Sequence, residues 1–161
     1  MNWKNWLKKW NMTSLKINAQ FLEMEFMPGE PDKDAAWELY IELLTRITTQ
    51  PLREGEGDEQ TALNSVYSLF GITRGIIKSH GRKCVEFTKL AIVVLNQVIR
   101  PFTAKWHKVS IEHGFANEEI CDSFRDELTT LQEMLCIYTK MLADMSGVED
   151  LTSLEETTKY S

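Results

Sequence analysis

An arginine and a histidine, Arg100 and His107, enclose six residues in the segment RPFTAKWH. A guanidinium binds phosphate oxygens through parallel hydrogen bonds, and an imidazole accepts or donates a proton near neutral pH. This pair of side chains could therefore bind a phosphodiester and move the protons that its cleavage requires. Pro101 disfavours a helical conformation at Arg100, so the two side chains need not share a helical face.

The same segment resembles the signature of the HEPN ribonucleases, in which a short spacer separates an arginine from a histidine. The resemblance implies a helical bundle that dimerises and cuts RNA without a metal ion. It assigns stabilisation of the phosphate to Arg100 and proton transfer to His107. Pro101 departs from the family pattern, which usually has a polar residue after the arginine. We therefore keep this catalytic pair as the alternative to a binding function.

Positive charge is concentrated in one part of an acidic chain. Residues 74–108 hold eight of the 18 lysines and arginines but only one of the 24 acidic residues, Glu86, although the whole chain has a formal net charge of −6. A basic surface of this kind attracts phosphates. The predicted ligand-binding residues are Arg74, Lys78, Arg82, Lys83, Arg100, Lys105, Trp106, His107 and Lys108.

Two alternatives limit this interpretation of the basic segment. Trp106 and Phe102 offer planes on which a base could stack, but both residues also suit an ordinary helical core. The cations could also form a solvated face that the acidic helices neutralise. The preferred ligand is a phosphate-rich small molecule, because phosphates are the cellular anions that need several cations at once.

The sequence lacks the motifs of several other kinds of site. It has three histidines and three cysteines, Cys84, Cys121 and Cys136, without metal-ligand spacing, so we expect no metal and no cofactor. Neither a P-loop nor a dinucleotide-binding or nucleophile-elbow motif occurs. An odd number of cysteines without a C-x-x-C pair favours reduced core thiols in a cytoplasmic protein.

Residues 1–11 predict a short amphipathic helix that is both basic and aromatic. Trp3, Trp6, Leu7 and Trp10 share one stripe, and Lys4 and Lys8 lie elsewhere on the circumference. Tryptophan with lysine is typical of a membrane interface, so the helix could bind the inner face of a membrane or a partner. Alternatively, the indoles dock on the protein's own core or on a sister subunit. The helix could also be the juxtamembrane edge of a longer protein.

Hydrophobic periodicity predicts an all-α fold, a bundle of four to five helices in a domain spanning residues 12–147. An alternating pattern predicts a strand-like arm over residues 14–27, ahead of the bundle. Residues 83–99 form the most apolar helix, which we expect to end or kink at Pro101. Asn117 caps the last long helix, and residues 148–161 form an acidic tail.

No apolar run approaches the length of a membrane span, and the start of the chain has no secretory signal pattern. We therefore expect a cytoplasmic location. If the N-terminal helix binds lipid, the location is the inner face of the membrane.

The chain as a whole resembles a small ancillary family of type III CRISPR systems. The similarity runs along residues 12–151 and includes the segments TSLKINAQFLEMEF, DAAWELYIELLTRITTQ and CVEFTKLAIVVLNQVIRPFTAKWHK. It implies a non-catalytic helical sensor that binds a cyclic oligoadenylate second messenger in antiviral defence. It also implies a homo-oligomer that passes the signal to a membrane effector part. A phosphate-binding module is thus the preferred function, ahead of a HEPN-like ribonuclease or a protein that binds membranes or partners through Trp3, Trp6 and Trp10.

Overall fold

Helices form nearly all of the regular structure in residues 1–46, 48–53, 55 and 57–154, which the computed structural model describes. The α-helices are α1 (Trp3–Lys9), α2 (Ala19–Glu23), α3 (Glu30–Leu44), α4 (Glu59–His80), α5 (Val85–Val94), α6 (Arg100–Glu112) and α7 (Glu118–Ser146). A 3₁₀ turn, η1 (Gly81–Lys83), follows α4, and a π-helical turn, η2 (Leu95–Ile99), joins α5 to α6. The all-α prediction is confirmed. Part of the predicted acidic tail, residues 155–161, lies outside the described residues.

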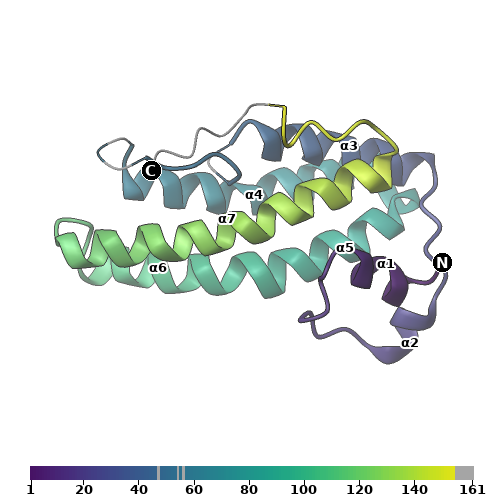
Figure 1. Cartoon of the computed structure of the whole chain (residues 1–161), viewed down its shortest axis with the longest axis horizontal. Coiled ribbons are helices and arrows are strands. Elements are labelled where there is room, and N and C mark those ends of the chain that lie inside the picture. Colours follow the sequence, from purple (N-terminus) through teal and green to yellow (C-terminus); the bar gives the residue numbers. More distant parts are fainter. Residues whose placement is uncertain (47, 54, 56, 155–161) are drawn as a thin grey trace.

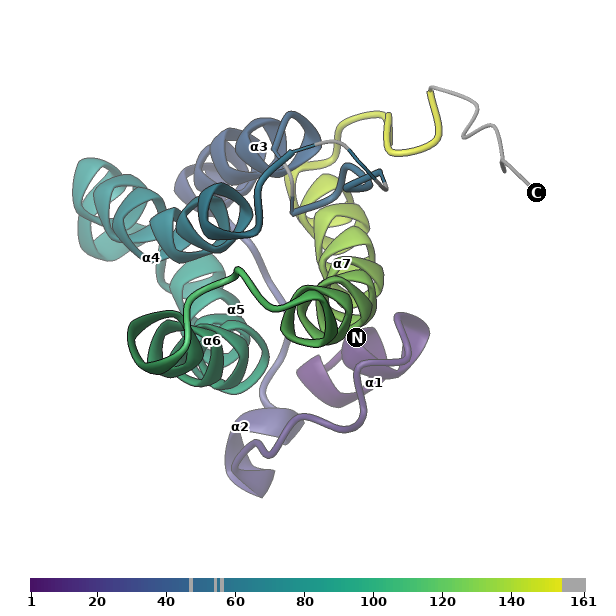
Figure 2. The same cartoon turned by 90° about the vertical axis from the view of Figure 1, so that its left-hand side faces the viewer.

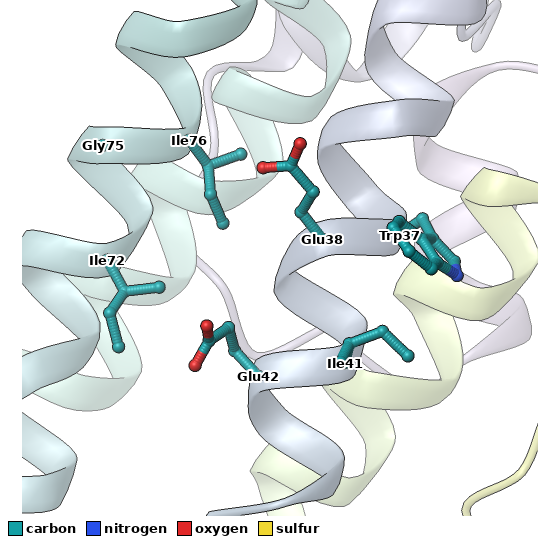
Figure 3. Close-up of a pocket in the computed structure, with 7 residues that line it drawn as sticks. All are labelled: Trp37, Glu38, Ile41, Glu42, Ile72, Gly75 and Ile76. Carbon is teal, nitrogen blue, oxygen red and sulfur yellow. The ribbon is translucent and has the colours of Figure 1, made fainter.

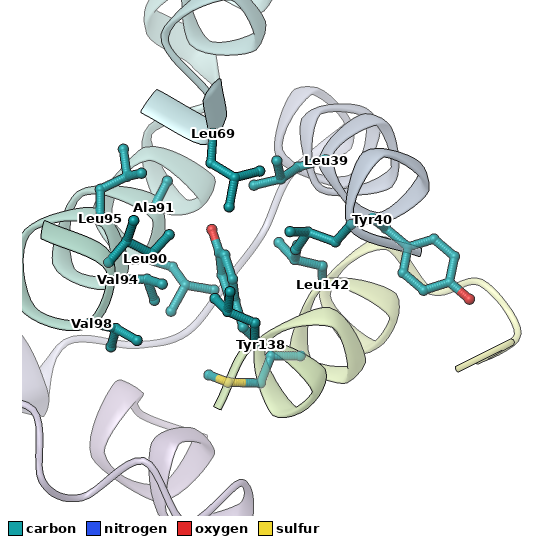
Figure 4. Close-up of a cluster of buried hydrophobic side chains, with 14 of the residues drawn as sticks. Leu39, Tyr40, Leu69, Leu90, Ala91, Val94, Leu95, Val98, Tyr138 and Leu142 are labelled. Atoms are coloured by element: carbon teal, nitrogen blue, oxygen red, sulfur yellow. The ribbon is translucent and has the colours of Figure 1, made fainter. Parts of the chain in front are cut away.

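The predicted helical bundle is confirmed. In the described part of the chain, α3, α4, α7 and the continuous rod α5–η2–α6 surround one core (Figures 1 and 2). α3 packs most extensively against α7. Leu39, Leu69, Leu90 and Leu142, from four different helices, gather around Tyr138 (Figure 4). Burial raises the pKa of Tyr138, so its hydroxyl stays protonated.

The rod α5–η2–α6 passes Pro101 without the end that we allowed for there, and its irregular part is the π-helical turn directly before Arg100 and Pro101. Arg100 has helical dihedral angles, φ −58° and ψ −42°. Its backbone N–H donates to the carbonyl of Leu95, five residues earlier. This wider turn relieves the crowding that a proline ring causes in an α-helix, and Pro101 sits in the first turn of α6, where its missing N–H costs little.

Helix α1 docks against the bundle through its tryptophans. Trp3 and Trp6 are each 1% exposed, and their rings pack with Phe26. Trp3 Nε1 donates to Glu86 Oε2 at 2.9 Å, and Trp6 Nε1 donates to Asp144 Oδ2 at 2.7 Å. The two indoles are therefore unavailable to a membrane or a partner in this conformation. This arrangement matches the alternative in which the indoles dock on the protein's own core. Trp10, at the end of α1, is partly buried.

The predicted strand-like arm is not seen. Residues 19–23 instead form α2, whose N-terminus is capped by the Asn18 side chain. Among the described residues the arm makes one isolated β-bridge, between Asn2 and Glu25. The side chain of Gln97 exchanges two hydrogen bonds of 2.8 Å with the backbone of Lys16. A lone strand would leave its backbone groups without partners, whereas the short helix and these contacts satisfy them.

Candidate functional site

The site begins where α4 reverses into α5 and α6. Gly81 ends α4 with φ +74°, a left-handed conformation that favours glycine, and the chain then returns beside α4. Residues far apart in sequence meet as a result. The Arg100 guanidinium lies 4.7 Å from the centre of the Phe70 ring, and the His107 ring lies 4.8 Å from the Tyr67 ring. Ser110 hydrogen-bonds Gln60 at the far end, so α6 runs antiparallel to α4.

Arg100 and His107 lie on the same side of α6. Seven residues are close to two helical turns, about 10 Å along the axis. Both side chains lie over the aromatic residues of α4. Pro101 therefore does not disturb the helical conformation of Arg100, and the two side chains share a helical face.

Six residues form a surface that we call the basic face: Tyr67, Arg74 and Lys78 of α4, and Arg100, His107 and Lys108 of α6. Their spacing places the three α4 residues on one stripe and the three α6 residues on another. The four lysines and arginines are exposed. Within the described part of the chain, none of the four forms an ion pair with a carboxylate.

Arg100 is held in place by neutral groups. Its guanidinium donates to Asn96 Oδ1 at 3.1 and 3.3 Å and covers the Phe70 ring. Neither partner neutralises the positive charge. Gly71 lies between Tyr67 and Arg74 in sequence, and a Cβ there would meet no atom within 4 Å. The surface of α4 is therefore open at Gly71.

Two predicted binding residues are occupied within the chain. Lys105 forms an ion pair with Glu127 of α7. Trp106 is 2% exposed, and its Nε1 donates to Glu127 Oε2 at 2.8 Å. Phe102 is also buried. Stacking of a base on Trp106 or Phe102 is therefore excluded in this conformation, and both residues belong to the core.

Arg82 and Lys83 lie in η1, beyond the Lys78 end of the basic face. Both are exposed, without a carboxylate partner among the described residues. Arg82 and Lys78 line an open groove of about 430 Å³ that also includes Val85. These cations extend the positive surface along the turn between α4 and α5.

Sequence analysis missed Tyr67, which is 53% exposed and contacts His107. The signal was present, since Tyr67 lies outside the apolar stripe of its helix and seven residues before Arg74. An aromatic residue on a polar helical face is available for stacking on a base or a ribose. Tyr67 therefore presents an exposed aromatic ring, whereas Trp106 does not.

A groove of about 420 Å³ between α3 and α4 has the opposite character (Figure 3). Its lining includes the carboxylates of Glu38 and Glu42 beside Trp37 and Ile41. Glu38 pairs with His80, and Glu42 pairs with Arg46. Acidic side chains disfavour phosphate here, so the two sides of α4 differ in the ligands that they can accept.

The described residues give little evidence for a metal site, a reactive cysteine or a membrane span. No group of three metal-ligating side chains is found among the described residues. Burial raises the pKa of the Cys121 and Cys136 thiols, and nearby carboxylates act in the same direction, so neither is an activated nucleophile. In the part of the chain that the structure covers, every helix is too short or too polar to cross a bilayer.

Comparison of this chain with protein-family models, curated proteins and solved structures finds no match. The resemblances to HEPN ribonucleases and to the CRISPR ancillary family are therefore unsupported by these comparisons.

Proposed function

We propose that the protein is a binding module for a phosphate-rich ligand and that the basic face is its binding surface. One observation carries the proposal: Arg74, Lys78, Arg100 and Lys108 lie on two adjacent helices, exposed and without a carboxylate partner in the described chain. Exposed cations that lack internal partners can exchange water for phosphate oxygens at low cost. Lys105, paired with Glu127, is no longer part of this set.

The proposed ligand is a short oligonucleotide, with a cyclic oligoadenylate as the preferred form. Arg74 and Lys78 are one turn apart on α4, so the face presents charge along a line rather than at a point. A phosphodiester chain carries its charges in a row and therefore suits such a surface. Tyr67 adds an exposed ring for a base. The cyclic form, a homo-oligomer, a role in antiviral defence and coupling to a membrane part come from the resemblance alone.

Charge reversal tests the proposal. We expect Arg74→Glu with Arg100→Glu to weaken binding of fluorescently labelled oligoadenylate about 100-fold, since each lost charge-assisted hydrogen bond costs about 1.5 kcal/mol or more. Fluorescence anisotropy measures the affinity, with cyclic and linear oligoadenylates of equal length. The slope of log K against log salt concentration should become less steep by about 1.4, because two phosphate contacts are lost.

The matched control is Lys33→Glu with Lys140→Glu, which changes the net charge equally on α3 and α7. It should retain most of the affinity. Equal losses in the two double variants would show that only net charge matters and would refute the site. Unchanged affinity in the Arg74 and Arg100 variant would do the same.

A metal-independent ribonuclease remains the second candidate function. The specific observation in its favour is that Arg100 and His107 lie on one side of a continuous helix, with His107 beside Tyr67. In this proposal Arg100 stabilises the phosphate, and His107 transfers a proton during cleavage. No metal takes part in this scheme.

Incubation with labelled RNA in the presence of EDTA separates the two functions. If the chain is a ribonuclease, His107→Ala should slow cleavage about 100-fold or more, because a positioned general acid or base contributes at least that much. His113→Ala, at an exposed histidine beyond the end of α6, is the matched control and should cleave normally. Oligoadenylate binding without cleavage by the unmodified protein would eliminate the enzyme.

A further inference from the structure

The N-terminal cap, formed by α1, α2 and the segment between them, contains a small cavity whose lining includes no residue of the basic face. Its volume is about 160 Å³. Its apolar lining consists of Leu7, Met12, Leu15, Ile17 and Leu22. Leu7 and Met12 belong to the buried core, whereas the other three are partly exposed. The cavity therefore has an apolar floor and an opening to solvent.

Two lysines stand at this opening. Lys4 and Lys8 line the cavity and are one turn apart on α1, with Leu7 between them in sequence. Both are exposed, and neither forms an ion pair with a carboxylate among the described residues. The described lining contains no acidic residue. An anionic group would thus be attracted to the rim of an apolar space.

The cavity size limits what can enter it. An apolar cavity of about 150 Å³ in another protein is large enough to bind benzene. An aliphatic group of about the same size as benzene has about six carbons. A full-length lipid acyl chain is far longer than this space.

We propose that this cavity binds a small amphipathic anion, an aliphatic chain of about six carbons that ends in a carboxylate or phosphate. The chain packs against Leu15, Ile17 and Leu22, and the head lies between the Lys4 and Lys8 ammonium groups. The assignment is independent of the phosphate-binding function proposed for the basic face. It gives the basic surface of α1 a role that does not need the buried rings of Trp3 and Trp6.

Calorimetric titration of the full chain with linear carboxylates from butanoate to decanoate tests the proposal. Affinity should rise about fourfold for each added CH₂ until the cavity is full, near six carbons, and then level off. Hexanoate should bind with a dissociation constant on the order of millimolar. Hexylamine, which has the same chain and the opposite charge, should bind at least about tenfold more weakly.

Two variants assign the binding to this place. Lys4→Glu with Lys8→Glu should weaken hexanoate binding at least about tenfold, whereas Lys33→Glu with Lys140→Glu, which changes the charge equally, should leave it unchanged. Leu15→Trp should block entry by filling the cavity, and circular dichroism shows whether it folds. The charge variant alters only surface positions, so the test does not depend on the folding of Leu15→Trp.

Flotation with phosphatidylglycerol vesicles distinguishes a free ligand from a membrane. Saturable hexanoate binding that Lys4→Glu with Lys8→Glu removes supports the cavity, whether or not vesicles also bind. Vesicle binding without saturable hexanoate binding would place the lysines on a membrane surface and overturn the assignment. Equal binding of hexanoate and hexylamine, or a continuous rise in affinity through decanoate, would overturn it as well.

Discussion

Replacement of Asp32 with alanine should lower the free energy of unfolding by about 4 kcal/mol, because two backbone N–H groups lose a charged acceptor. Asp32 is 2% exposed. One carboxylate oxygen accepts from the backbone N–H of Gly29 at 2.8 Å, and the other accepts from Phe87 at 3.0 Å. The second bond caps α5 from α3, since the N-cap residue of α5, Cys84, makes no side-chain capping bond.

Urea denaturation followed by far-UV circular dichroism measures this effect. Asp32→Asn retains one acceptor oxygen and should lose less stability than the alanine variant. Asp34→Ala, two residues along and exposed, is the matched control and should change stability by less than about 1 kcal/mol. Equal stability of the Asp32 and Asp34 variants would show that the buried carboxylate does not hold α5 to α3.

Replacement of Trp3 with alanine should also cost about 4 kcal/mol, the usual range for deletion of a buried tryptophan. The Trp3 ring lies 5.0 Å from Phe21 and 4.9 Å from Phe26. Its loss would leave a large cavity beneath α1 and remove a hydrogen bond to Glu86, which also pairs with Lys89. The expected result is a lower urea midpoint together with faster tryptic cleavage in residues 1–28.

Trp37→Ala is the control for the Trp3 variant. Trp37 is 49% exposed on α3 and should contribute less than about 1 kcal/mol. A similar loss of stability in both variants would contradict the docking of α1. It would reopen the alternative that the N-terminal indoles face a membrane or a partner.

The long helices could be predicted because their patterns are local. Buried side chains recur at helical spacing along α7 from Phe124 to Met145, and Asn117 caps the helix as expected. The arm was not predictable in the same way. Alternation over residues 15–21 favours a strand, but a strand needs a neighbour, and no neighbouring strand is present among the described residues. The Asn18 cap favours the short helix α2, and the hydrogen bonds of Gln97 hold the backbone before it in place of a partner strand.

The candidate site was predicted in part. The basic residues of α4 and α6 lie on two packed helices because the antiparallel connection returns the chain beside α4, as the contact of Arg100 with Phe70 illustrates. The loss of Lys105 and Trp106 to Glu127 could not be foreseen, since that partner lies more than 20 residues later on α7. The exposure of Tyr67 agrees with its place outside the apolar stripe of α4, but its contact with His107 depends on which side of α4 meets α6, which is a tertiary property.

The wide turn η2 determines how α6 is rotated about the axis of the rod, and so which of its side chains face the core. Buried side chains recur every four residues along the rod, at Val94, Val98, Phe102 and Trp106. In a regular α-helix the side chain at the last of these positions would point about 120° away from the first. The extra residue per turn in η2 reduces this difference. If the same residues were wound as a regular α-helix through η2, α6 would turn by about 100° and Trp106 would move to the angular position that His107 now holds, outside the core. One inserted residue thus keeps the aromatic interior and the charged exterior of this rod aligned along its whole length.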